Sequence, residues 1–184
     1  MVKLGAQVIR LNPDVNFPLP KYGTAGSAAL DLYANIEHDE VLFAGENKKI
    51  PTGLKLWHGN PEYAGVILPR SSGGSGGMNL KNLVGLIDSD YQGELIVNVW
   101  NNNEVGSITI PSWKRGVAFA QITFVRVAQL VMEEVKEFSE ETLRGTGGFG
   151  STDGVKIVEV GNPKIPANMR DVIWADYELG MGTK

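Results

Sequence analysis

Glu94-Leu95-Ile96-Val97-Asn98-Val99-Trp100 is the stretch of sequence that decides the fold. Leu95, Val97 and Val99 alternate with the residues between them, so an extended backbone places the two sets on opposite faces. Both sets are biased toward apolar side chains, which is typical of a strand that is covered on both sides. The stretch therefore predicts a β-strand that is buried on both faces.

Other short runs of the same kind lie on either side of this strand in the sequence. Residues 61–69 and 105–110 have the composition of short strands, and residues 117–132 are β-branched and aromatic in their first half. Residues 133–141 then become polar. Clusters of Gly, Pro and Asn separate the runs, and this punctuation is expected of an all-β sandwich or barrel.

Composition limits the possible classes of function. The chain has 184 residues, which is most simply one domain. Its 17 basic and 21 acidic residues give a net charge of −4, which argues against a general affinity for nucleic acid or for an anionic membrane. Without cysteine and with only 2 histidines, disulfides and thiolate or histidine-rich metal sites are excluded. No apolar run approaches about 20 residues, and residues 1–7 lack the apolar core of a signal peptide, so we expect a cytoplasmic protein.

A glycine-rich stretch near the end of the chain has the chemistry of a phosphate lid. It reads Arg144-Gly145-Thr146-Gly147-Gly148-Phe149-Gly150-Ser151-Thr152. Its glycines let backbone N–H groups approach phosphate oxygens, and Arg144 can grip a terminal phosphate with two N–H groups. Ser151 and Thr152 add hydroxyl donors, and Phe149 offers a face on which a base can stack. Taken alone, the stretch also fits a mobile linker.

Together with four earlier segments, this stretch resembles the five ordered motifs of the trimeric dUTPase family. The earlier segments are Ala25-Gly26-Ser27-Ala28-Ala29-Leu30-Asp31-Leu32, Pro69-Arg70-Ser71-Ser72, Gly85-Leu86-Ile87-Asp88-Ser89-Asp90-Tyr91-Gln92-Gly93-Glu94 and Gly116-Val117-Ala118-Phe119-Ala120-Gln121. The resemblance covers roughly residues 5–153. It implies an antiparallel jelly-roll barrel or sandwich that assembles as a homotrimer with active sites between subunits, and an enzyme that hydrolyses dUTP to dUMP and pyrophosphate.

The resemblance also implies a division of the chain. Residues 1–143 would form the β core, residues 144–153 the lid motif, and residues 154–184 a C-terminal extension of unknown role. Within the extension, residues 155–160 read as a strand and residues 166–179 as a helix with one apolar face. We expect it to pack on the trimer or to bind a regulatory protein partner, and a dispensable extension is the alternative.

Asp88 carries the chemistry that the resemblance implies. A fixed carboxylate can orient a water molecule in line with its leaving group and accept its proton, and Asp88 matches the family's general base. The alternative is a polar hairpin turn with solvated charges. Mg²⁺ would be held largely by triphosphate oxygens and water, with Asp31 near the metal through a water molecule, because this hard ion keeps much of its hydration shell.

The resemblance assigns base and sugar selection to residues near Asp88. The ring of Tyr91 would pack on deoxyribose and leave no room for a 2′-hydroxyl, unless it only anchors the hairpin. The hairpin Asn82-Leu83-Val84-Gly85 would read the uracil edge through backbone groups at Val84 and Gly85 and the Asn82 side chain, which otherwise only stabilises the turn. The implied contacts to phosphates and to the stacked base are Arg70, Ser71, Ser72, Gln121, Arg144, Phe149, Gly150, Ser151 and Thr152.

Two departures from the family pattern lie within the matched region. Ala118 stands where an arginine is usual, so that either Arg115 compensates or a subunit contact is lost. The loop of residues 73–78 is unusually rich in glycine, which predicts greater mobility and a larger ordering cost on binding.

Two other functions remain as alternatives. A dCTP deaminase has a similar sheet, but its proton-shuttling glutamate would align with Asn98, which cannot shuttle protons as a carboxylate does. A dUTPase scaffold can also serve as a regulatory binding protein that dUTP switches.

Overall fold

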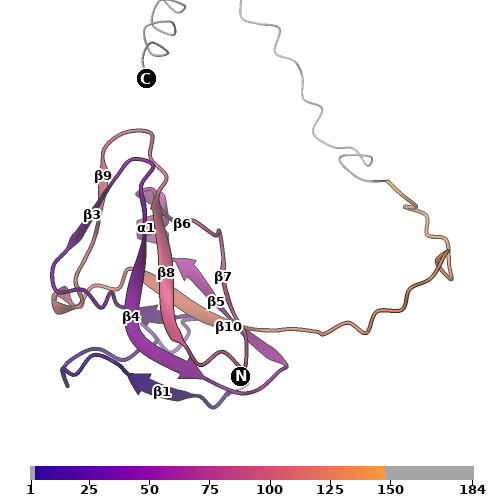
Figure 1. Cartoon of the computed structure of the whole chain (residues 1–184), viewed down its shortest axis with the longest axis horizontal. Helices are drawn as coiled ribbons and strands as arrows, with labels where there is room; N and C mark the ends of the chain where they lie inside the picture. The colour runs from indigo at the N-terminus through magenta and orange to yellow at the C-terminus, as the bar shows by residue number, and fades with distance from the viewer. Residues whose placement is uncertain (1–2, 148–184) are drawn as a thin grey trace, which may run out of the picture. The chain divides into compact units, whose positions relative to one another are not determined.

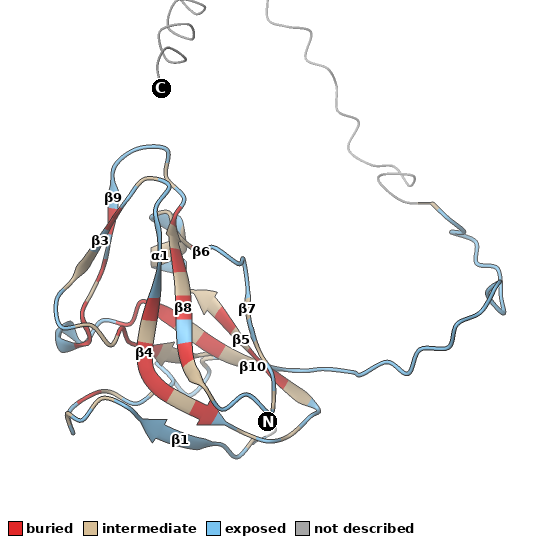
Figure 2. Ribbon diagram, in the orientation of Figure 1, coloured by how far each residue is buried: buried red, intermediate tan, exposed pale blue. Residues whose placement is uncertain are grey.

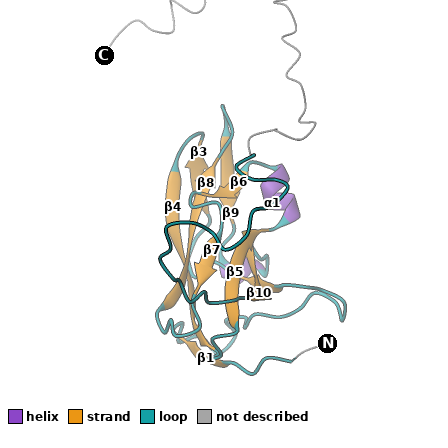
Figure 3. Cartoon of the chain, turned by 90° about the vertical axis from the view of Figure 1, so that its right-hand side faces the viewer, coloured by secondary structure: helices purple, strands orange, loops and turns teal. Residues whose placement is uncertain are grey.

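The computed structural model describes residues 3–147, and it divides after Val131 into two compact units that are described separately. All strands and helices of the described residues lie in the first unit, as Figure 3 shows. The strand predicted at 155–160 and the helix predicted at 166–179 lie outside the described residues. No helix among the described residues is long and apolar enough to span a membrane.

Three antiparallel sheets build the first unit (Figure 1). The first has the order β1 (Gln7–Arg10), β4 (Asn47–Trp57), β8 (Glu94–Asn101) and β6 (Met78–Leu80). The second has the order β2 (Leu30–Leu32), β10 (Ala120–Arg126), β5 (Tyr63–Pro69) and β7 (Gly85–Ile87). The third pairs β3 (Glu40–Phe43) with β9 (Ser107–Ile110). The predicted all-β fold is confirmed, and each strand predicted within residues 3–147 overlaps an observed one.

The hydrophobic core lies between the first two sheets, and β8 runs through it (Figure 2). Leu95, Val97 and Val99 are at most 2% exposed, and they belong to one cluster with Ile67 of β5 and Ile122 of β10. This face of β8 is buried as the alternation predicts. Fully burying such side chains stabilises the fold by about 1.5–3 kcal/mol each, which makes this cluster the main source of stability in the first unit.

The other face of β8 is not fully buried, in contrast to the prediction that both faces are. Ile96 is 48% exposed, and Asn98 and Trp100 are half-buried. Lys81 lies over the Trp100 ring, with its Nζ 4.3 Å from the ring centroid, so a long charged side chain covers part of this face. The prediction was wrong for the single chain because, among the described residues, no second sheet packs on this side.

The strand predicted within residues 117–132 is shorter than its composition suggests. It is β10, which begins at Ala120, because a turn precedes it: the 3-10 helix η1 (Trp113–Arg115) ends at Gly116 with a left-handed φ of 65°. The strand ends at Arg126, after pairing with β5 along its whole length. Val131 is fully exposed in the unit that it ends. The apolar residues after Arg126 therefore do not belong to the core of the first unit.

The glycine-rich segment after β5 begins with a short helix instead of an irregular loop. Residues Ser71–Ser75 form the short helix α1, with Arg70 at its N-cap. The segment is then tied to the turn after β8, where Asn103 Nδ2 donates to the Gly76 carbonyl oxygen at 3.0 Å and the Asn102 N–H donates to that of Gly77 at 2.8 Å. The predicted mobility of residues 73–78 stays a prediction, but residues 73–75 of this loop are helical.

Candidate functional site

A polar cluster forms where β2, β10 and β5 lie side by side. Gln121 of β10 is directly opposite Asp31 of β2, and its Nε2 donates to the Pro69 carbonyl oxygen at 2.9 Å. Arg70, which follows β5, places its Nε 3.2 Å from Asp31 Oδ1 and donates from Nη1 to the Ala118 carbonyl oxygen at 3.1 Å. The register of three strands thus brings together three residues that the sequence predicts at the phosphates and the metal.

The Arg70 side chain is held in this cluster without being buried. It is 37% exposed, and the carboxylate of Asp31 is 21% exposed. A guanidinium carries five N–H donors in a fixed plane, and the two contacts described use only part of that set. Arg70 is therefore oriented by its neighbours and still presents donors to solvent, as a phosphate-binding arginine requires.

Ser71 and Ser72 are placed beside Arg70 by the start of α1. Both residues are exposed. The Arg70 carbonyl oxygen accepts a hydrogen bond from the Gly74 N–H at 2.8 Å, and the Ser72 carbonyl oxygen accepts one from Gly76 at 3.2 Å, so the backbone of this turn is fixed. Ser71 and Ser72 therefore follow Arg70 directly in the sequence, in a turn whose backbone is fixed.

The departure at Ala118 has a structural consequence. Ala118 is 7% exposed and belongs to a small core cluster with Phe17, Tyr33, Leu54 and Trp113, and it contributes its carbonyl oxygen to Arg70. Arg115 does not occupy the same place, because its Nη1 pairs with Asp39 Oδ2 at 3.1 Å. Within one chain, therefore, Arg115 does not compensate for the missing arginine.

The segment of residues 82–85 is a crossover rather than the predicted hairpin. The strand before it, β6, pairs with β8 in the first sheet, and the strand after it, β7, pairs with β5 in the second. The hairpin prediction was wrong because pairing of these strands with β8 and β5 replaces pairing with each other. Leu83 takes a left-handed φ of 63°, and the Asn82 side chain donates to the Val84 carbonyl oxygen at 3.0 Å. Asn82 therefore stabilises the turn, as the alternative interpretation proposed; a contact with uracil stays a prediction.

Asp88 and Tyr91 sit in a tight turn that follows β7. The Tyr91 N–H donates to the Asp88 carbonyl oxygen at 3.2 Å, and the Ser89 carbonyl oxygen accepts a hydrogen bond from Gly59, so the turn is fixed to the end of β4. Both predicted site residues are exposed. The turn connects strands of different sheets, so the alternative of a simple hairpin turn does not describe it.

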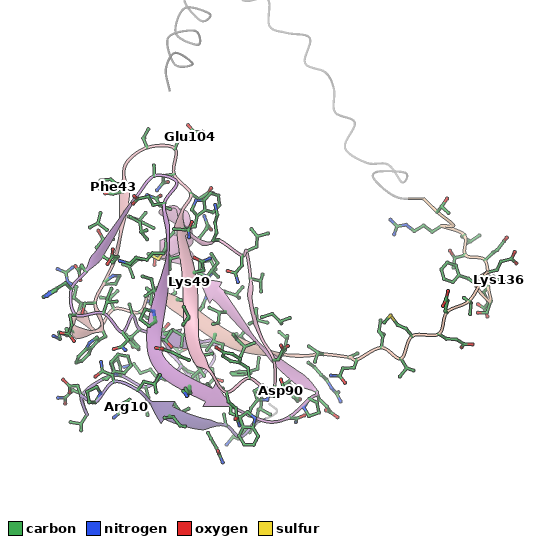
Figure 4. All side chains as sticks on the ribbon, in the orientation of Figure 1. Arg10, Phe43, Lys49, Asp90, Glu104 and Lys136 are labelled. Atoms are coloured by element: carbon green, nitrogen blue, oxygen red, sulfur yellow. The ribbon has the colours of Figure 1, made fainter. Side chains whose placement is uncertain are left out.

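The cluster at Arg70 and the turn at Asp88 lie at opposite ends of the ladder between β5 and β7. Ile87 is opposite Gly65, which places Asp88 at the level of Ala64, whereas Arg70 lies beyond the other end of β5. At about 3.3 Å per residue, the two levels are roughly 20 Å apart. Figures 1 and 4 agree, because α1 lies near one end of the sheets and the labelled Asp90 near the other. One chain therefore does not bring Asp88 to Arg70.

Only the first part of the predicted lid lies within the described residues. In the second unit, Arg144 Nε donates to the Gly147 carbonyl oxygen at 3.0 Å, and the Gly147 N–H donates to the Arg144 carbonyl oxygen at 2.9 Å. The predicted contacts at Phe149, Gly150, Ser151 and Thr152 lie outside the described residues.

Asp31 is the residue that the sequence predicts near a metal ion. The described residues contain no group of three or more His, Asp and Glu side chains that converge on one point. Asp31 uses one carboxylate oxygen for Arg70, which leaves the other for a water molecule on a cation. A hydrated Mg²⁺ held mainly by phosphate oxygens needs no more protein ligands than this.

Two features near the turn at Asp88 were not predicted. Gly93 and Glu94 contact the Tyr91 side chain, although the sequence shows them only as part of a motif. His58 packs its ring edge against Phe124, and burial lowers the pKa of His58 below 6.5. A lone histidine in the sequence gives no signal of this partial burial, which depends on the fold.

Comparison with known proteins agrees with this geometry. A family model described as dUTPase matches residues 15–153. The deoxyuridine 5′-triphosphate nucleotidohydrolases of Pseudomonas fluorescens (strain Pf0-1) and Pseudomonas entomophila (strain L48) are 48% and 49% identical to this chain, over 82% of it and 97% of each relative.

Solved structures show the same fold. The dUTPase of Staphylococcus bacteriophage 80alpha with dUpNHpp is similar with a TM-score of 0.69 and 24% identity, over 80% of this chain and 98% of that one. A mutant dUTPase from phage phi11 of S. aureus, studied for the coordination of a structural Mg(II) ion, is similar with a TM-score of 0.62 and 22% identity, over 74% of this chain and 99% of that one.

Proposed function

The chain belongs to the dUTPase family, and from this membership we propose that it hydrolyses dUTP to dUMP and pyrophosphate. The observation that carries the proposal is the exposed carboxylate of Asp88, fixed in the turn after β7 within the region that matches the family. Such an enzyme keeps uracil out of DNA and supplies dUMP, the precursor of thymidylate.

Asp88 acts as the general base in this proposal. Its carboxylate accepts a proton from a water molecule as the water oxygen forms a bond to the α-phosphorus of dUTP. The bond from that phosphorus to the bridging oxygen breaks, and pyrophosphate leaves with the electron pair. Because the turn is fixed through Ser89 to the end of β4, the backbone that carries Asp88 is positioned before the substrate binds.

Selection of base and sugar is assigned to the residues that flank Asp88. We propose that backbone groups of Val84 and Gly85, with the Asn82 side chain, pair with the uracil edge. The exposed ring of Tyr91 excludes ribonucleotides by collision with a 2′-hydroxyl. Strand β7 places Gly85 and Asp88 about 10 Å apart along an extended backbone, so the residues assigned to the base and to the reacting phosphate are separate.

The phosphates are assigned to the cluster of Arg70, Ser71, Ser72 and Gln121, with Arg144, Phe149, Gly150, Ser151 and Thr152 closing over the nucleotide. Arg70 is oriented for this by Asp31 and by the Ala118 carbonyl oxygen. Asp31 would lie near Mg²⁺ through a water molecule, and the ion would neutralise charge on the triphosphate and its leaving group.

We propose that the active protein is a homotrimer with shared sites. The support is the separation of roughly 20 Å between the level of Asp88 and that of Arg70, which exceeds the reach of one bound triphosphate. A second copy of the chain would supply the Arg70 cluster that one chain does not bring to its own Asp88 turn. The half-exposed Ile96 face of β8 supports the same proposal, because an apolar face of this kind is typically covered in an assembly.

Two further assignments complete the proposal. We propose a cytoplasmic location, where the nucleotide pool lies. Residues 154–184 follow the region that matches the family, and we propose that they dock on the trimer or on a regulatory protein partner rather than take part in hydrolysis. A regulatory role would act beside catalysis, since Asp88, Tyr91 and Arg144 are all present.

The test of the function is hydrolysis of four nucleotides, dUTP, dCTP, dTTP and UTP, with Mg²⁺. The proposal expects pyrophosphate release from dUTP only, with dUMP as the product. Appearance of a uracil nucleotide from dCTP would support deamination instead, and tight binding of dUTP without turnover would support a purely regulatory protein.

A further inference from the structure

The ring of Tyr91 lies directly against the backbone of Gly93. A Cβ atom added to Gly93 would stand 2.5 Å from Tyr91 Cζ and 2.9 Å from Cε2, and closer still to the hydroxyl oxygen. Real Cβ contacts are never this short, so no larger residue fits at Gly93 while the ring keeps its position. The φ of Gly93 is in the ordinary range, unlike that of Gly53. A larger residue at Gly93 therefore fits only if the Tyr91 ring moves from its position.

The far end of the same ring is also held. The Tyr91 hydroxyl donates to the Glu94 carbonyl oxygen at 2.9 Å, and Glu94 is the first residue of β8. The Glu94 carboxylate accepts a hydrogen bond from the Gly53 N–H at 2.8 Å, at the irregularity in the pairing of β4 and β8. A hydrogen bond of this charge-assisted type is stronger than a neutral one. Tyr91 is thus fixed to the two central strands of the first sheet.

We infer that Gly93 and Glu94 are positioning residues that set the discrimination between deoxyribonucleotides and ribonucleotides. The inference rests on the proposed function, in which Tyr91 excludes a 2′-hydroxyl by collision. A collision rejects a substrate only if the ring cannot yield, because a mobile ring moves aside at little cost. Tyr91 is 41% exposed, so solvent alone does not confine it, and the contacts with Gly93 and Glu94 supply the rigidity.

The first test is Gly93→Ala, with Gly5→Ala as the matched control because a Cβ at Gly5 has no atom within 4 Å. Values of kcat/KM are measured for dUTP and for UTP. We expect the preference for dUTP over UTP to fall about tenfold or more in Gly93→Ala and to be unchanged in Gly5→Ala. A binding pocket typically discriminates on this scale between two substrates that differ by one small group. Tyr91→Phe keeps the ring and removes its hydrogen bond, so we expect a smaller fall in the same ratio.

A second measurement separates positioning from general destabilisation. If Gly93 acts through Tyr91, then adding Gly93→Ala to Tyr91→Leu, which has no ring to displace, leaves the ratio where Tyr91→Leu puts it. A further fall in the double variant would overturn the inference. The inference would also be overturned if Gly93→Ala lowered the melting temperature but left the preference for dUTP over UTP unchanged, because a purely structural glycine would give that result. If Gly93→Ala does not assemble, an unchanged ratio in Tyr91→Phe overturns the inference. Failure of the natural chain to hydrolyse dUTP would instead overturn the proposed function.

Discussion

Mixed trimers made from two inactive variants are predicted to recover activity. The first variant, Arg70→Ala, removes the phosphate cluster's arginine, and the second, Asp88→Asn, removes the general base. Each alone is expected to lose about a hundredfold or more in kcat, the scale of a lost general base or a lost charge at a phosphate. The levels of these residues along β5 are roughly 20 Å apart, so a functional site takes them from different chains.

The expected recovery follows from this separation. A site works in a mixed trimer when the chain that supplies Arg70 is the Asp88→Asn variant and its neighbour is the Arg70→Ala variant. With equal amounts and random assembly, about one quarter of all sites meet both conditions. The mixture should therefore show about a quarter of the natural activity per chain, although each parent alone is nearly inactive.

The assay is release of pyrophosphate from dUTP after the two variants are unfolded together, refolded and purified as trimers. Arg126→Ala is a suitable reference partner, because Arg126 forms only an exposed ion pair with Glu62 at 3.2 Å. Mixed with Asp88→Asn, it should give about half of the natural activity, because only one of the two conditions then applies. A mixture of Arg70→Ala and Asp88→Asn no more active than its parents would refute the shared site, provided that the reference mixture is active.

Four further predictions follow from the structure. Burial lowers the pKa of His58 below 6.5, so the unfolded chain takes up a proton at this residue first as the pH falls, and stability decreases below about pH 6.5. Urea unfolding at about pH 7.5 and 5.5 should therefore show a smaller loss of unfolding free energy in His58→Phe than in the natural chain. Asp31→Asn removes the charge that pairs with Arg70, and it should raise both the KM for dUTP and the Mg²⁺ concentration needed for half activity. If neither value changes, the assignment of Asp31 to the phosphate and metal site is contradicted. Asn101→Leu leaves the buried Leu42 carbonyl oxygen without its 2.9 Å hydrogen bond and should lower the free energy of unfolding by about 1–3 kcal/mol in denaturant titrations; no loss would mean that the bond contributes nothing. A chain that ends after Asp153 should keep its kcat for dUTP while it loses melting temperature or partner binding, and equal stability and binding would show that the extension is dispensable.

The sequence predicted the class of fold correctly, whereas the roles of the site residues stay predictions. Alternation in residues 94–100 identified the core face of β8, because burial of one face imposes a period of two on any strand. The length of β10 was overestimated because apolar composition continues past Arg126, whereas pairing with β5 does not. Composition records which residues favour an extended backbone, but the end of a strand depends on where its partner ends.

The arrangement of the site was less accessible to sequence reasoning. The segment Asn82–Gly85 resembled a hairpin because turn residues separate two β-prone runs, and nothing local indicates that β6 and β7 belong to different sheets. The separation of Asp88 from Arg70 is likewise a matter of register, which the sequence of either segment does not contain. Gly93 stood in a recognised motif, but its contact with Tyr91 depends on a side-chain position that only the folded turn defines.

The measurement that tests the central claim most directly is the release of pyrophosphate and dUMP from dUTP by the natural chain and by Asp88→Asn, assayed together with Mg²⁺. We expect rapid release from dUTP, little from dCTP, dTTP or UTP, and a loss of about a hundredfold or more in kcat for Asp88→Asn, with its binding of dUTP retained. Undiminished turnover in Asp88→Asn would contradict the assigned general base, and the absence of dUMP from the natural chain would contradict the proposed function itself.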